Sequence, residues 1–204
     1  MNAPRHIIGL VMLASVVWLT GCAGSAGAPS MFLLENADTT TGASRVSGPT
    51  LVIDPVTVAP FLSESGIVYQ TGPHRVVIAN NNRWASPLDS QLTDGLYTAL
   101  SDALSDVSVR HYGRQTGASA MHLATQVDEF MGHYDGHAHI TGRWQLIGPD
   151  GTTLVGRQFS QRLPLASDGY DALVGSLSRG WRNTADDMAP ALDDAIDAAG
   201  SSLD

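Results

Sequence analysis

The sequence contains no lysine, because all 11 of its basic residues are arginines. Without lysine, the chain has neither the phosphate-binding lysine of a P-loop ATPase nor an amine that can form a Schiff base. Its 20 acidic residues give a formal net charge of -9 at pH 7. Since nucleic-acid binding depends on clustered positive charge, no nucleic-acid partner is expected.

Cysteine is almost absent as well. Cys22 is the single cysteine, which excludes an intramolecular disulfide and a thiolate metal cluster. It follows an apolar run over residues 7–19, which is shorter than the roughly 20 residues that a permanent membrane span needs. Residues 1–21 are therefore predicted to be a signal peptide.

The end of this segment, Leu19-Thr20-Gly21-Cys22, resembles the lipobox of bacterial lipoproteins. The resemblance implies that the signal is cut before Cys22 and that this residue carries diacylglycerol and an N-linked acyl chain such as palmitate. Several acyl chains hold a protein durably on a membrane. Ala23, rather than an aspartate, follows the cysteine, so we expect the periplasmic face of the outer membrane. Residues 22–30 are expected to form the lipidated tether.

The rest of the chain alternates between strand and helix patterns. A first helix is expected after Ser86-Pro87, with Ser86 as its cap and leucines at every fourth position. The strand expected over residues 75–79 is predicted to end at Asn80-Asn81-Asn82. Residues 31–192 are therefore predicted to form a single α+β domain, with a mostly antiparallel sheet and two main helices packed on it. Residues 193–204 are expected to be an acidic, flexible tail.

Three histidines near residue 135 raise the question of a metal site. His137 and His139 would share one face of a strand, close to His133. That face is predicted to be the solvent face, and no cysteine or glutamate stands at a ligand spacing to complete the set. We therefore expect surface histidines and predict neither a metal nor a cofactor.

No sequence motif indicates catalysis. The segment GSLSRG at residues 175–180 has the wrong spacing for a Gly-x-Ser-x-Gly elbow and lies within a helix pattern. The paired aspartates at 186–187 and 193–194 point apart on a helix. The chain is not expected to be an enzyme.

One compact motif, Arg83-Trp84-Ala85-Ser86-Pro87-Leu88, stands out. In a structural interpretation Trp84 fills the core where a strand becomes a helix. In a functional interpretation Arg83 and Trp84 anchor a protein partner, because both residue types are enriched at interface hot spots. Both interpretations remain open from the sequence.

This motif, together with Pro60-Phe61-Leu62 and Ile67-Val68-Tyr69, resembles the signature of PqiC-type lipoproteins, the auxiliary components of ABC transporters. Phe32-Leu33-Leu34 and the later segment from Asp135-Gly136 to Trp144-Gln145-Leu146 are also similar. One departure is Ser63-Glu64-Ser65-Gly66, where family members often carry an Asp-Arg pair.

The resemblance implies a non-catalytic subunit of a lipid transport system. In such systems an ABC permease and ATPase work with a periplasmic protein that carries mammalian-cell-entry (MCE) domains. The lipoprotein would dock this conduit at the outer membrane and support envelope integrity, and a homo-oligomer is compatible with the family. Arg83, Trp84 and Tyr69 are the candidate partner-binding residues. The alternative function is a lipoprotein that regulates or assembles a cell-wall synthesis enzyme.

Overall fold

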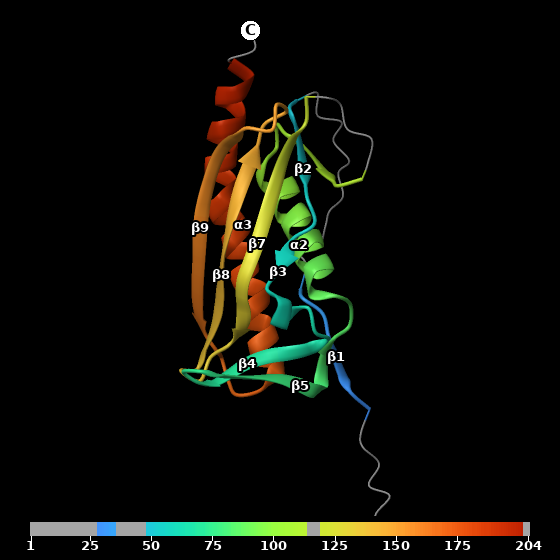
Figure 1. Ribbon diagram of the computed structural model, residues 1–204, viewed down its shortest axis with the longest axis vertical. Coiled ribbons are helices and arrows are strands. Elements are labelled where there is room, and N and C mark those ends of the chain that lie inside the picture. Colours follow the sequence, from blue (N-terminus) through green and yellow to red (C-terminus); the bar gives the residue numbers. More distant parts are fainter. Residues whose placement is uncertain (1–27, 36–47, 114–118, 202–204) are drawn as a thin grey trace, which may run out of the picture.

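The computed structural model describes residues 28–35, 48–113 and 119–201 (Figure 1). Cys22, the predicted signal peptide and most of the predicted tether lie outside the described residues. Within the described ranges, no helix combines the length and apolarity needed to cross a membrane. The elements in chain order are β1 (Ser30–Phe32), β2 (Thr50–Ile53), β3 (Thr57–Val58), the 3-10 helix η2 (Pro60–Leu62), β4 (Gly66–Gly72), β5 (Arg75–Trp84), α2 (Leu88–Ala103), β6 (Ser108–His111), β7 (Met121–Gly132), β8 (His137–Ile147), β9 (Thr153–Pro164) and α3 (Tyr170–Ser201).

The nine described strands form one mixed sheet. The long strands β7, β8 and β9 form an antiparallel ladder, and β4 and β5 form a second antiparallel hairpin. On its other edge β7 pairs in parallel with β2, β3 and β4, and the pairs β1–β5 and β2–β6 are also parallel. The α+β prediction is confirmed, but "mostly antiparallel" fits only the long hairpins. Parallel strands need a crossover connection between them. In the pairs β2–β6 and β2–β7 this connection includes α2, which follows β2 in the chain and returns the chain to the same end of the sheet.

The two helices cover the buried face of this ladder. The leucines that recur at every fourth position of α2 are buried as predicted, and Leu92, Leu96 and Leu100 are fully inaccessible to solvent. On β8 the predicted inward face from Ala138 to Leu146 is buried as well. The indole Nε1 of Trp181 in α3 donates a hydrogen bond of 3.0 Å to the Leu92 carbonyl of α2. The helices are therefore tied to each other as well as to the sheet.

Long β7, β8 and β9 run along the molecule, whereas the β4–β5 hairpin lies across one end (Figure 1). Strand β1 lies at the same end, paired with the last residues of β5. Helix α3 begins near this end and its last turn lies at the other. The two ends of the molecule are therefore formed by different segments of the chain.

Two predicted boundaries are wrong. The asparagines at 80–82 do not end a strand, because β5 continues to Trp84, pairing with β1 at Asn82 and with β4 at Arg83. The residues predicted to be a flexible tail from 193 continue α3 to Ser201. Burial explains this second difference, since Ile196 is fully buried and outweighs the effect of Pro190 within the helix.

The start of α2 also differs from the prediction. The capping position is Pro87, and no side chain caps the helix. Ser86 contributes its carbonyl oxygen instead, which accepts a hydrogen bond of 2.8 Å from Gln91 Nε2. The Oε1 atom of the same glutamine accepts the Leu34 amide at 2.8 Å. Buried Gln91 therefore joins the segment after β1 to the first turn of α2.

Candidate functional site

The motif from Arg83 to Leu88 lies where β5 ends and α2 begins. Trp84 is only 4% exposed and its ring centroid lies 6.2 Å from that of Phe130 in β7. Trp84 is therefore a core residue, as the structural interpretation predicted, and its role in partner binding stays a prediction. Arg83 is exposed, and its Nε donates a hydrogen bond of 2.7 Å to the Asn80 carbonyl. The motif therefore supplies one core residue and one surface cation.

Tyr69, the third predicted partner residue, is half-buried at the edge of a cleft of about 370 Å³. The cleft lies between β4, the β7–β8 turn and the start of α3, and Leu165 and Leu173 form part of its apolar lining. Tyr69 packs edge-on against Tyr170 with 6.1 Å between their ring centroids. The ring centroid of Phe32 lies 6.2 Å from that of Tyr170. The sequence motif did not indicate Tyr170, which lies 101 residues after Tyr69 in the chain and is brought beside it by the fold.

Tyr170 is the electrostatically perturbed member of this aromatic group. Desolvation by burial is the largest cause, followed by the charge of an ionised Tyr69 and a hydrogen bond with it, and together they raise the pKa of the Tyr170 phenol. The Tyr170 phenol therefore remains neutral at physiological pH. The cleft presents hydroxyl groups and apolar surface rather than charge, which suits a peptide or an acyl chain better than an ion.

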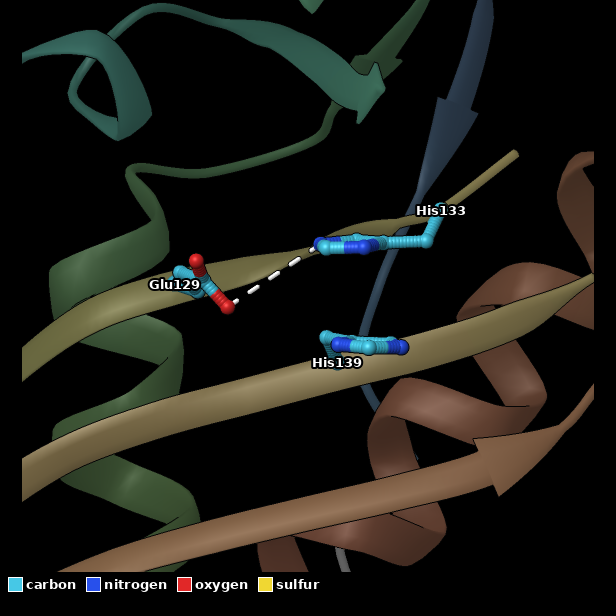
Figure 2. Close-up of side chains that lie close together, drawn as sticks. All are labelled: Glu129, His133 and His139. Carbon is cyan, nitrogen blue, oxygen red and sulfur yellow. Dashed lines mark ion pairs between the residues drawn. The ribbon is translucent and has the colours of Figure 1, made fainter. Parts of the chain in front are cut away.

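A second cluster lies on the outer face of the β7–β8 hairpin, where Glu129, His133 and His139 converge (Figure 2). The ladder pairs Met131 with His139 and Glu129 with Thr141. His139 is therefore the diagonal neighbour of both Glu129 and His133, which stand two residues to either side of Met131. The expectation that no glutamate completes a ligand set is wrong, because the register supplies one that local spacing does not reveal.

The two imidazoles of this cluster stack with their centroids 3.6 Å apart and their planes 5° apart. Glu129 Oε2 lies 3.9 Å from His133 Nε2, and that buried nitrogen has no hydrogen-bond partner among the described residues. Desolvation and the neighbouring His139 lower the pKa of His133, although Glu129 and Asp135 act in the opposite direction. His133 is therefore a neutral imidazole with an unused polar atom.

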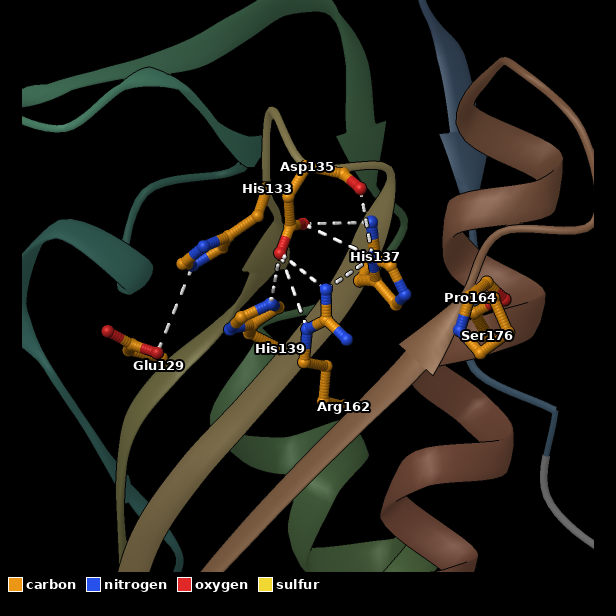
Figure 3. A network of polar contacts seen from close by, with 8 residues as sticks. All are labelled: Glu129, His133, Asp135, His137, His139, Arg162, Pro164 and Ser176. Carbon is orange, nitrogen blue, oxygen red and sulfur yellow. Dashed lines mark hydrogen bonds and ion pairs between the residues drawn. The ribbon is translucent and has the colours of Figure 1, made fainter.

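Asp135, in the β7–β8 turn, contacts two of the histidines and an arginine of β9 (Figure 3). Its Oδ2 accepts a hydrogen bond of 3.0 Å from Arg162 Nη2 of β9 and lies 3.3 Å from His139 Nε2. Its Oδ1 accepts the His137 amide at 3.1 Å. Desolvation opposes ionisation, but these hydrogen bonds and the nearby positive charges lower the pKa of Asp135 to about 2. An ionised Asp135 thus fixes the turn to β9.

These groups do not form a nucleophilic site. Among the described residues, the histidine rings contact carboxylates, an arginine, other rings and a backbone carbonyl, and none is hydrogen-bonded to a serine or threonine hydroxyl. His122, for example, lies 2.8 Å from Asp54 through Nδ1. An activated hydroxyl nucleophile needs a base within hydrogen-bond reach.

Comparison with known proteins supports the family resemblance found in the sequence. The model of the family "ABC-type transport auxiliary lipoprotein component" matches residues 32–189. The curated Intermembrane transport lipoprotein PqiC of Escherichia coli K12 is 35% identical over 181 residues, covering 88% of this chain and 94% of the relative, and PqiC of Shigella flexneri gives the same values.

Solved structures show the same fold. The crystal structure of an uncharacterised protein has a TM-score of 0.71 and 33% sequence identity, covering 81% of this chain and 99% of the other. A protein from Xanthomonas campestris also has a TM-score of 0.71, at 17% identity over 84% of this chain and 99% of the other. By its match over nearly the whole described body and by its similarity to curated relatives, the chain belongs to the family of ABC-type transport auxiliary lipoprotein components.

Proposed function

We propose that this chain is a lipid-anchored, non-catalytic subunit of an MCE-type ABC lipid transport system. It is held by Cys22 at the periplasmic face of the outer membrane, where it docks the periplasmic conduit and supports envelope integrity. The observation that carries the proposal is the family match over residues 32–189, downstream of a segment that resembles a lipobox. The curated relatives are named intermembrane transport lipoproteins.

The short tether supports a definite orientation of the body. Seven residues separate Cys22 from Ser30, the first residue of β1. Fully extended, they reach at most about 25 Å. A lipid on Cys22 therefore holds the end of the molecule with β1 and the β4–β5 hairpin near the membrane (Figure 1). The last turns of α3 then point into the periplasm.

The membrane-proximal end also has the chemistry of a protein interface. Exposed Arg83 and half-buried Tyr69 belong to the β4–β5 hairpin, and both residue types are enriched in interface cores. The same end exposes apolar side chains from β1, from the residue after it and from β5, namely Met31, Leu33, Val76 and Ile78. A conduit that extends as far as the outer-membrane surface would lie beside this end of the lipoprotein. Arg83 and Tyr69 are therefore its proposed contacts.

Capture of partners from native membranes tests the proposal. The tagged full-length lipoprotein, extracted in a mild detergent after cross-linking, should recover an MCE-domain protein and its permease. Arg83→Glu and Tyr69→Ala should each reduce the recovery. Arg157→Glu, at an exposed position of β9 away from the hairpin, is the matched control and should leave it unchanged.

The opposite results are equally clear. If no MCE-domain protein is recovered, the proposed docking role is wrong. If a peptidoglycan synthase is the consistent cross-linked neighbour instead, the chain regulates a cell-wall enzyme. Equal loss of capture in Arg83→Glu and Arg157→Glu would show that net charge, rather than the hairpin, controls the interaction.

A further inference from the structure

We propose that Glu129, His133 and His139 bind one first-row divalent transition-metal ion, with Zn²⁺ as the ion that fits best. The inference is independent of the transport role and rests on the geometry of the β7–β8 hairpin. It concerns three side chains that lie close together on the outer face of this hairpin (Figure 2).

The three side chains already stand close enough to share an ion. One potential ligand atom from each lies within 4.8 Å of the other two. Zinc binds nitrogen and carboxylate oxygen at about 2.0–2.2 Å, so ligand atoms around a tetrahedral ion lie about 3.4 Å apart. The Glu129 to His133 separation of 3.9 Å is near that value. The two stacked imidazole rings have to rotate out of their parallel arrangement before a nitrogen of each can face the same ion.

The donor set selects a class of ion. Two imidazoles and one carboxylate suit zinc and its first-row neighbours, whereas magnesium and calcium prefer oxygen ligands alone. Two histidines and one glutamate are also a known three-ligand set for zinc, which leaves a fourth position for water. The Glu129 side chain is 36% exposed and that of His133 is 15% exposed, so an ion can reach the cluster from the Glu129 side.

The buried nitrogen of His133 supplies a second, independent observation. Its Nε2 faces Glu129 and has no hydrogen-bond partner among the described residues. A buried polar atom without a partner is destabilising by about 1–3 kcal/mol, and most such atoms in native proteins are satisfied. A metal ion between His133 and Glu129 would occupy its lone pair.

The contacts around His139 also have the form of a metal site. Asp135 Oδ2 lies 3.3 Å from His139 Nε2 and is held in place by Arg162 (Figure 3). A carboxylate only accepts hydrogen bonds, so this contact puts the imidazole proton on Nε2 and leaves the lone pair on Nδ1. Metal-binding histidines characteristically donate their other nitrogen to a carboxylate in this way.

Zinc titration of the mature lipoprotein in detergent tests the inference. After treatment with a chelator, the protein is titrated with Zn²⁺ alone in a calorimeter. One ion should bind per chain. Glu129→Gln and His139→Gln should each weaken binding by more than tenfold, because the loss of a ligand should exceed the roughly 10–100-fold effect of losing an outer contact.

Matched variants separate this site from adventitious zinc. Glu64→Gln and His74→Gln change the same residue types at exposed positions outside the cluster, and both should bind zinc as the parent does. Unchanged binding in Glu129→Gln and His139→Gln, or no binding by the parent, would overturn the inference. Circular dichroism tests whether each variant is folded. Substitution with Co²⁺ gives an absorption spectrum that reports tetrahedral nitrogen and oxygen ligands, and a change in stability alone does not produce that spectrum.

Discussion

Trp84→Ala distinguishes a core role from an interface role for the most distinctive residue of the motif. Trp84 is 4% exposed and packs beside Phe130. A tryptophan buries about 150–250 Å², which corresponds to about 4–6 kcal/mol at about 25 cal/mol per Å². Alanine keeps part of this area, and measured Trp→Ala and Phe→Ala changes cost about 3–5 kcal/mol. We expect a loss of that size in the free energy of unfolding.

Urea and thermal unfolding, followed by circular dichroism at the helix band, measure this loss. For a domain of this size each kcal/mol shifts Tm by about 2–4 °C, so a decrease of about 6–20 °C is expected. Trp84→Phe should recover much of the stability, and Arg83→Ala at the exposed neighbouring position should change it by no more than about 0.5 kcal/mol. An unchanged Tm in Trp84→Ala, combined with lost capture of the transport partner, would refute the core assignment.

Three further changes test other parts of the structure. Gln91→Leu removes the acceptor of the buried Leu34 amide and should lower stability by about 1–3 kcal/mol in urea unfolding, whereas Gln145→Leu at an exposed position of β8 should not. Gly142→Ala should destabilise by about 1–3 kcal/mol, because a Cβ there overlaps the Gln126 carbonyl and comes within 2.5 Å of Phe159; Gly72→Ala, with open space around it, is the control, and equal melting of the two would contradict this packing. Tyr170→Phe should remove the tyrosinate absorbance that develops at the highest pH, since burial raises the pKa of Tyr170. Because that pKa is raised, the parent keeps its stability below the ordinary value of about 10 and loses it as pH rises through the folded-state pKa. If Tyr170→Phe instead removes tyrosinate absorbance that develops at the ordinary tyrosine pKa, Tyr170 is solvated.

Local patterns predicted the parts of the fold that depend on one segment at a time. The leucine stripe of α2 and the inward face of β8 followed from periods of 3.6 and 2 residues. The predicted ends of strands and helices were wrong where tertiary contacts determine how far an element extends. Asn82 belongs to a strand because it pairs with Ser30, and α3 continues past Pro190 because Ile196 has a core to enter.

The parallel pairs and the candidate sites depend on contacts between distant segments, which a single sequence does not specify. Glu129 joins the histidine cluster only through the β7–β8 register, including the shift between Val127 and Glu129. Tyr170 reaches Tyr69 only when α3 packs beside β4. Within the motif at residues 83–88, composition alone did not separate a core tryptophan from a surface one, whereas burial does.

The central claim is that this body works as a subunit fastened to a membrane through Cys22. Mass spectrometry of the native mature protein tests it most directly. The account predicts an amino-terminal peptide that begins at Cys22 and carries both thioether-linked diacylglycerol and an N-acyl chain. An unmodified amino terminus at a residue well downstream of Cys22 would contradict it.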